Sequence, residues 1–138
     1  MTESPQAEVV AEDAQEQGTV VVDAVLRHDI DHVWRVLTTN DGAAAFLGEG
    51  ACLGSKGQTW QAADGTHGVW RSYHPMEQVR VSWHATADAP RSLVDLHLAP
   101  QGEHTAVSVR HEHVQGDHAA LGERWRAALA RIDALAEY

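Results

Sequence analysis

The sequence of 138 residues has little cysteine and lysine: one of each, Cys52 and Lys56. A single cysteine excludes an intramolecular disulfide. No apolar run approaches the roughly 18 residues of a membrane span, and the N-terminus lacks the basic and apolar segments of a signal peptide. We therefore expect a soluble, cytoplasmic protein that does not contact membranes.

Positive charge is also scarce. Lys and Arg together number 10 against 20 Asp and Glu, which gives a net charge of −10. Without a basic stripe to meet phosphates, nucleic acid is not expected as a partner, and an anionic membrane is disfavoured for the same reason. Residues 1–17 hold five acidic residues and no Lys or Arg. They carry too little apolar surface to offset the entropy of ordering, so we predict a disordered acidic leader.

The longest periodic stretch is the C-terminal one, residues 117–138. Its apolar residues recur every three or four positions, which predicts one amphipathic helix capped by Asp117. About twenty residues make a helix of roughly 30 Å, long enough to cross a small domain. The predicted apolar stripe consists of Ala119, Leu121, Trp125, Ala128, Leu129, Ile132 and Leu135.

Most of the remaining chain has the pattern of β-strands. β-branched residues, or an alternation of apolar and polar residues, mark these segments, and short Gly- or Pro-containing turns separate most of them. Two short helices interrupt the series after the first strand. Asp29 or Asp31 is expected to cap the first helix, and the second is expected to start at Asn40 or Asp41. The predicted strands are residues 19–27, 58–62, 66–73, 78–85, 92–98 and 105–114.

This order of elements predicts an α+β helix-grip fold in one domain, residues 18–138. Sequential strands joined by short turns favour a curved antiparallel sheet, here of about six to seven strands. Two short helices follow the first strand, and the long C-terminal helix packs across the sheet. Alternation places Trp83 on the concave side, and it places Val107, Val109, His111 and His113 on one face of the last strand.

Several local patterns in this order resemble the START-like superfamily (SRPBCC, birch-pollen-allergen-like). The closest resemblance is to the branch named after the activator of the ninety-kilodalton heat-shock chaperone. The segment DIDHVWRVLTTNDGAAAFLG is similar to that family's first-helix pattern, with Phe46 where the family usually has Trp. The segments GTHGVW, HPMEQVRVSWHA and HTAVSVRHEHV resemble its strands, and Trp125, Leu129 and Ile132 fit its closing helix.

The resemblance implies a cavity between the C-terminal helix and the sheet. Aromatic and aliphatic walls with a few polar groups are typical of small-ligand pockets. The leading hypothesis is non-catalytic binding or sequestration of a small hydrophobic or aromatic molecule by a monomer or weak dimer, without a cofactor. The candidate ligand-binding residues are Trp34, Phe46, Trp60, Trp70, Val81, Trp83, Leu96, Val109, His111, His113, Leu121, Trp125 and Leu129.

Two alternatives stay open, and the resemblance supplies both. One is a polyketide cyclase or dehydratase in which an inward histidine, His111 or His113, acts as acid or base. The other is a protein-interaction role, as a chaperone co-factor or as a bacterial natural-product self-resistance protein. A structural histidine bonded to the backbone is the simpler interpretation of either residue.

A metal site and a reactive thiol are not predicted. His111 and His113 offer two ligands on one strand face, whereas zinc sites need three or four. Cys52 lies in a loop with no neighbouring basic pair or helix N-terminus to lower its pKa, so we interpret it as a buried or idle thiol. No catalytic residue is assigned.

Overall fold

The computed structural model describes residues 18–137, which contain three helices and six strands. None of these helices is both long and apolar enough to cross a membrane. In chain order the elements are β2 (Thr19–Leu26), α2 (Ile30–Leu37), α3 (Asn40–Leu47), β3 (Thr59–Gln61), β4 (His67–His74), β5 (Gln78–Trp83), β6 (Ser92–Gln101), β7 (His104–Glu112) and α4 (His118–Leu135).

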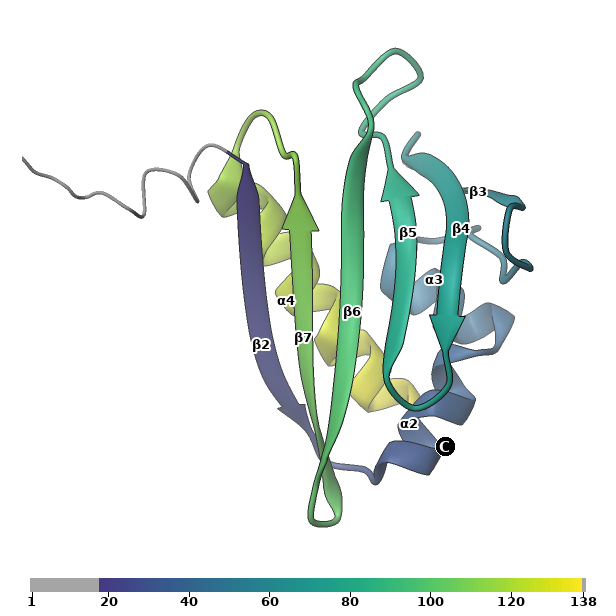
Figure 1. Cartoon of the computed structure of the whole chain (residues 1–138), viewed down its shortest axis with the longest axis vertical. Coiled ribbons are helices and arrows are strands. Elements are labelled where there is room, and N and C mark those ends of the chain that lie inside the picture. The colour runs from purple at the N-terminus through teal and green to yellow at the C-terminus, as the bar shows by residue number, and fades with distance from the viewer. Residues whose placement is uncertain (1–17, 138) are drawn as a thin grey trace, which may run out of the picture.

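In the described part of the chain the strands form one antiparallel sheet, in the order β2-β7-β6-β5-β4-β3. Strands β3 to β7 pair with one another in chain order as a meander. The first strand, β2, pairs with the last, β7, so that Val22 lies opposite Val109. Figure 1 shows the curved sheet with the helices on one face and α4 running diagonally across it. The predicted helix-grip fold is confirmed, with six strands.

Each helix begins at a side chain that accepts a hydrogen bond from a backbone N–H of the first turn, as N-caps do. Asp29 caps α2 through His32, and Asp117 caps α4 through Ala120. The cap of α3 is Thr39, whose hydroxyl accepts from the N–H of Gly42, and the helix starts at Asn40, one of the two predicted starts.

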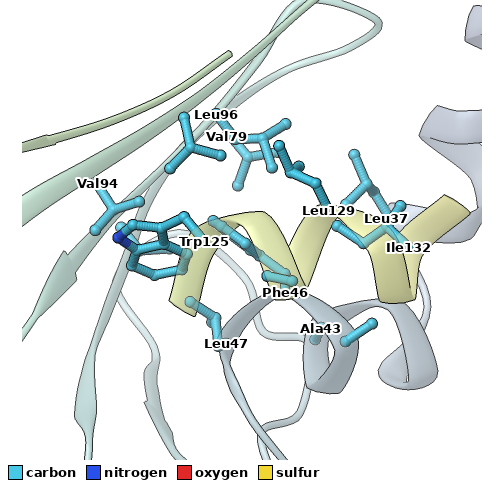
Figure 2. Packing of buried hydrophobic residues seen from close by; sticks show 14 of the residues in the cluster. Leu37, Ala43, Phe46, Leu47, Val79, Val94, Leu96, Trp125, Leu129 and Ile132 are labelled. Atoms are coloured by element: carbon cyan, nitrogen blue, oxygen red, sulfur yellow. The ribbon is translucent and has the colours of Figure 1, made fainter. Parts of the chain in front are cut away.

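The core lies between α4 and the sheet, with α3 closing one side. Trp125, Leu129 and Ile132 of α4 are at most 2% exposed, and Phe46 of α3 packs against Trp125 with ring centroids 5.8 Å apart. In Figure 2, Trp125 lies beside Val94 and below Leu96 of the sheet, while Ile132 lies beside Leu37 of α2. Ala119 is exposed, contrary to the predicted stripe, because six residues of helix turn it about 120° away from Trp125.

Candidate functional site

The buried side-chain hydrogen bonds of the interface between α4 and the sheet are centred on His111, which lies on β7 and is 0% exposed. The Trp125 indole Nε1–H donates to His111 Nδ1 at 3.1 Å, so Nδ1 carries no hydrogen. The other ring nitrogen, Nε2, therefore carries it and donates to Ser92 Oγ at 2.7 Å. Ser92 Oγ–H in turn donates to the backbone carbonyl of Trp83 at 2.8 Å. These four residues form one continuous chain of hydrogen bonds.

Strand register brings three of these residues together. Val94 pairs with His111 and Ser92 pairs with Trp83, so neighbouring strands β7, β6 and β5 present all three side chains on the face covered by α4. Residues two apart on a strand share a face, which places Ser92 next to the row of Val94 and His111. Trp125 reaches the same point from α4.

The His111 imidazole is neutral at pH 7. Burial is the main cause, together with the nearby charges of Arg124 and His118, and it lowers the pKa of His111 to about 4. Both ring nitrogens are engaged, so neither lone pair nor hydrogen is free for a substrate. In this arrangement His111 positions the indoles, and acting as a base requires that Trp125 first give up its bond.

Aromatic rings and one guanidinium surround the imidazole. Trp83 meets His111 edge-on at a centroid distance of 4.9 Å, and Trp125 at 5.6 Å. The guanidinium carbon of Arg124 lies 5.4 Å from the Trp83 ring centroid and 5.8 Å from that of Trp125. Arg124 is fixed by Asp64 at 3.0 Å and by the carbonyl of Leu47 at 2.9 Å. The indoles therefore lie beside a fixed positive charge.

A hollow of about 50 Å³ adjoins this network at the start of α4. Two loops form its outer wall, one after β5 and one after β7, and Leu121 contributes from α4. Its lining residues are Trp83, Ala85, Ala89, Pro90, Ser92, His111, His113, Val114, Gln115 and Leu121.

His113 differs from its predicted position. β7 ends at Glu112, and His113 has a backbone φ of 63°, in the left-handed region, with its side chain exposed. The alternation of the strand therefore stops one residue before His113. The prediction that it shares the buried face of His111 is wrong, although His113 contributes to the wall of the hollow.

The structure divides the predicted ligand-binding residues into three groups. The first group lies at the hollow. It is lined by Trp83, His111, His113 and Leu121, and Trp125 donates a hydrogen bond to His111. A second group fills the core between helices and sheet and is at most 2% exposed: Phe46, Val81, Leu96, Val109 and Leu129.

The third group lies away from the hollow. Trp60 on β3 and Trp70 on β4 are buried, and their indoles donate to the carbonyls of Ser82 and Cys52, each at 3.2 Å. Trp34 is half-buried on α2. Cys52 is exposed, so of the two interpretations of its thiol, buried or idle, the structure contradicts the first. Among residues 18–137, no three His, Cys, Asp or Glu side chains are placed to hold a metal ion.

Sequence reasoning missed Ser92 and Arg124. Ser92 had one usable signal: it begins a predicted strand in which the apolar Val94, Leu96 and Leu98 alternate with polar residues and share the face of Ser92. Arg124 had none, because its partners Asp64 and Leu47 lie 60 and 77 residues away along the chain.

A larger open groove of about 930 Å³ runs between α3 and α4 on the side away from the sheet. Alanine is the commonest residue of its lining, which also includes charged side chains of both signs. It is lined by Asp41, Ala44, Ala45, Gly48, Glu49, Ala63, Asp64, Arg124, Ala127, Arg131, Ala134 and Leu135.

Comparison with protein families identifies the family of this chain. The model described as "Activator of Hsp90 ATPase homolog 1-like protein" matches residues 27–137. No curated protein matches the sequence.

Solved structures share the fold at low sequence identity. DynU16, described as a putative protein in the dynemicin biosynthetic locus, has a TM-score of 0.73 and 19% identity over 86% of this chain, which spans only 47% of DynU16. CalU16 from Micromonospora echinospora has a TM-score of 0.71 and 18% identity over 86% of this chain and 75% of its own. The Aha1 dimer from Colwellia psychrerythraea has a TM-score of 0.69 and 16% identity over 83% of this chain and 92% of its own.

Proposed function

Because the chain belongs to the family of Activator of Hsp90 ATPase homolog 1-like proteins, within the SRPBCC/START-like superfamily, we propose that it binds a small hydrophobic or aromatic molecule without transforming it. The binding site is the hollow where α4 begins. One observation carries this proposal: the interface between helix and sheet contains an unfilled space there, bounded by Trp83, His111 and Leu121.

The walls of the hollow suit an apolar guest. Trp83 supplies a large flat surface, and Pro90, Val114 and Leu121 supply aliphatic contacts. Small-ligand pockets are typically of this kind, apolar with one or two placed polar groups. Here the polar group is the pair of Ser92 and His111, whose mutual hydrogen bond is already made.

The hollow is small in the present conformation. Its volume of about 50 Å³ compares with roughly 30 Å³ for each water molecule in the liquid. A ligand therefore inserts one end there, and its remaining atoms lie outward against the loop of residues 85–90. Movement of that loop is the simplest way to enlarge the site, because it is not part of a strand.

The chemistry of His111 supports binding over catalysis. A cyclase needs a group that exchanges a proton with the substrate, whereas both nitrogens of His111 are bonded inside the protein. CalU16 and DynU16 resemble this chain in fold, and the description of DynU16 as a protein in the dynemicin biosynthetic locus makes natural products a reasonable class of ligand to screen.

Native mass spectrometry of the gently purified chain tests the proposal. We expect an added mass that leaves on denaturation, and we expect Leu121→Trp to abolish it by filling the space next to Trp83. Leu135→Trp is the matched control, because Leu135 is also half-buried on α4 but lies in the α3–α4 groove. A mass retained by Leu121→Trp and lost from Leu135→Trp would move the ligand to that groove and contradict the proposal.

A further inference from the structure

One hydrogen-bond donor beside the hollow is unused. The Trp83 side chain is 6% exposed, and its indole Nε1–H is buried without a partner among the described residues. Every other hydrogen of the network is committed: Trp125 donates to His111, His111 to Ser92, and Ser92 to the Trp83 carbonyl. A buried donor without an acceptor destabilises the molecule, so an acceptor that reaches it binds with a gain.

The other unpartnered nitrogen of this region is no competing donor. His118 Nδ1 lies 3.1 Å from the carbonyl of Gly116 and donates to it, while Nε2 is buried without a partner among the described residues. His118 is not among the residues that line the hollow, so its Nε2 does not face a ligand there. Among the described residues that line this space, Trp83 therefore supplies the one buried donor without a partner.

The charge around the hollow restricts the guest further. No Asp or Glu lines it, and the Arg124 guanidinium lies 5.4 Å from the Trp83 ring centroid. A cation would be repelled there and would find no carboxylate. A carboxylate would find a single buried free donor, too few to replace its hydration. A neutral oxygen with partial negative charge is not repelled by the Arg124 guanidinium, and one donor is enough to replace its hydrogen bond to water.

We infer that the hollow receives a neutral carbonyl oxygen of its ligand, which accepts a hydrogen bond from the Trp83 indole N–H. The ligand class is then an apolar or aromatic ketone, aldehyde or comparable carbonyl compound. The space next to Trp83 is large enough for such a group and not for the body of the ligand. This inference rests on the proposed function and adds the polar group by which the site selects.

Two isosteric probes test the inference on the full chain. Acetophenone and α-methylstyrene have nearly the same shape, but the first has an oxygen where the second has a CH₂ group. We expect acetophenone to bind about tenfold more tightly, as one hydrogen bond to a buried donor allows. Acetophenone should also shift the Trp83 indole N–H resonance in ¹H–¹⁵N spectra. That resonance is assigned as the indole peak that is missing from the spectrum of Trp83→Phe.

Variants separate the indole from general packing. Trp83→Phe should abolish the preference for acetophenone. Trp34→Phe should keep it, because Trp34 is half-buried on α2, away from the hollow. The comparison of the two probes in the unmodified protein stands even if Trp83→Phe fails to fold.

The outcomes distinguish this inference from the proposed function. Equal or weaker binding of acetophenone than of α-methylstyrene overturns the carbonyl assignment, while binding at the hollow survives. Binding of 1-phenylethylammonium as tight as that of acetophenone overturns it as well. If neither neutral probe binds and native mass spectrometry shows the bare chain, the proposed function fails, and this inference fails with it.

Discussion

At the scale of single residues, His111 is the buried polar group on which the interface is built. Its imidazole joins a helix side chain, Trp125, to a strand side chain, Ser92, through two hydrogen bonds in one tautomer. A buried polar group with both sites satisfied is tolerated in a core, whereas a protonated one is not. Protonation would set an N–H of His111 against the N–H of Trp125.

The pH dependence of stability follows from this arrangement. Burial lowers the pKa of His111 to about 4 from 6.5, so the unfolded chain binds the proton first as the pH falls. The stabilisation is fully present above pH 6.5 and is lost as the pH falls through about 4. The difference corresponds to about 3 kcal/mol in the free energy of unfolding. Urea unfolding between pH 7 and 4 measures it.

The control for this prediction is His111→Gln, which cannot titrate at this position. Carboxylates such as Asp64 and Asp133, whose pKa values hydrogen bonds and Arg neighbours lower, contribute to acid sensitivity in both proteins. The free energy of unfolding should therefore fall by about 3 kcal/mol less in the variant. An imidazole of His111 that titrates near 6.5 in NMR spectra contradicts the buried neutral form.

At the residue scale, the sequence predicted on which face of a strand a side chain lies, but not which residue it bonds to. Alternation along β7 identified His111 as inward, because a strand turns successive side chains to opposite faces. It could not identify Ser92 as the hydrogen-bond partner, since that depends on the register between β6 and β7. It also failed at His113, where the backbone leaves the extended conformation with a φ of 63°.

At the scale of elements, α4 is attached at its middle by Arg124. The guanidinium bonds to Asp64 in the turn between β3 and β4 and to the carbonyl of Leu47 at the end of α3. It also covers the indoles of Trp83 and Trp125. One side chain thus connects the long helix, a short helix and a turn of the sheet.

Arg124→Ala should lower the free energy of unfolding by about 2 kcal/mol, because a charged donor to the Leu47 carbonyl and contact with two indoles are lost together. Arg126→Ala is the matched control on the same helix. Its guanidinium is 3.4 Å from Glu123 and the side chain is 58% exposed, so we expect a loss below about 0.5 kcal/mol. Equal losses in urea unfolding would mean that Arg124 does not anchor the helix.

Elements were predicted better than their ends. The hydrophobic period of residues 117–138 identified α4, and alternation identified the sheet, because both patterns are local. The start of α3 was left open between Asn40 and Asp41, and Thr39 was not identified as its cap, since Thr39, Asn40 and Asp41 are all acceptable caps. The contacts of Arg124 were out of reach because they join segments far apart in sequence.

At the scale of the whole molecule, the helix and sheet are closely packed along α4 and leave a space near its N-terminal end. Phe46, Trp125 and Leu129 occupy the middle of the interface (Figure 2). The hollow lies where Leu121 faces the loops after β5 and β7. The fold was predictable from sequence, whereas the size and place of the space were not, because they depend on how far each large side chain reaches.

The most direct test of ligand binding at this place is backbone NMR of the full chain titrated with acetophenone. We predict that the largest shift changes fall on Ala85, Ser92, His111, Val114 and Leu121, around the hollow. Residues of the α3–α4 groove, such as Ala44 and Ala127, should change little. Changes concentrated in that groove, or spread evenly over the surface, would contradict the account.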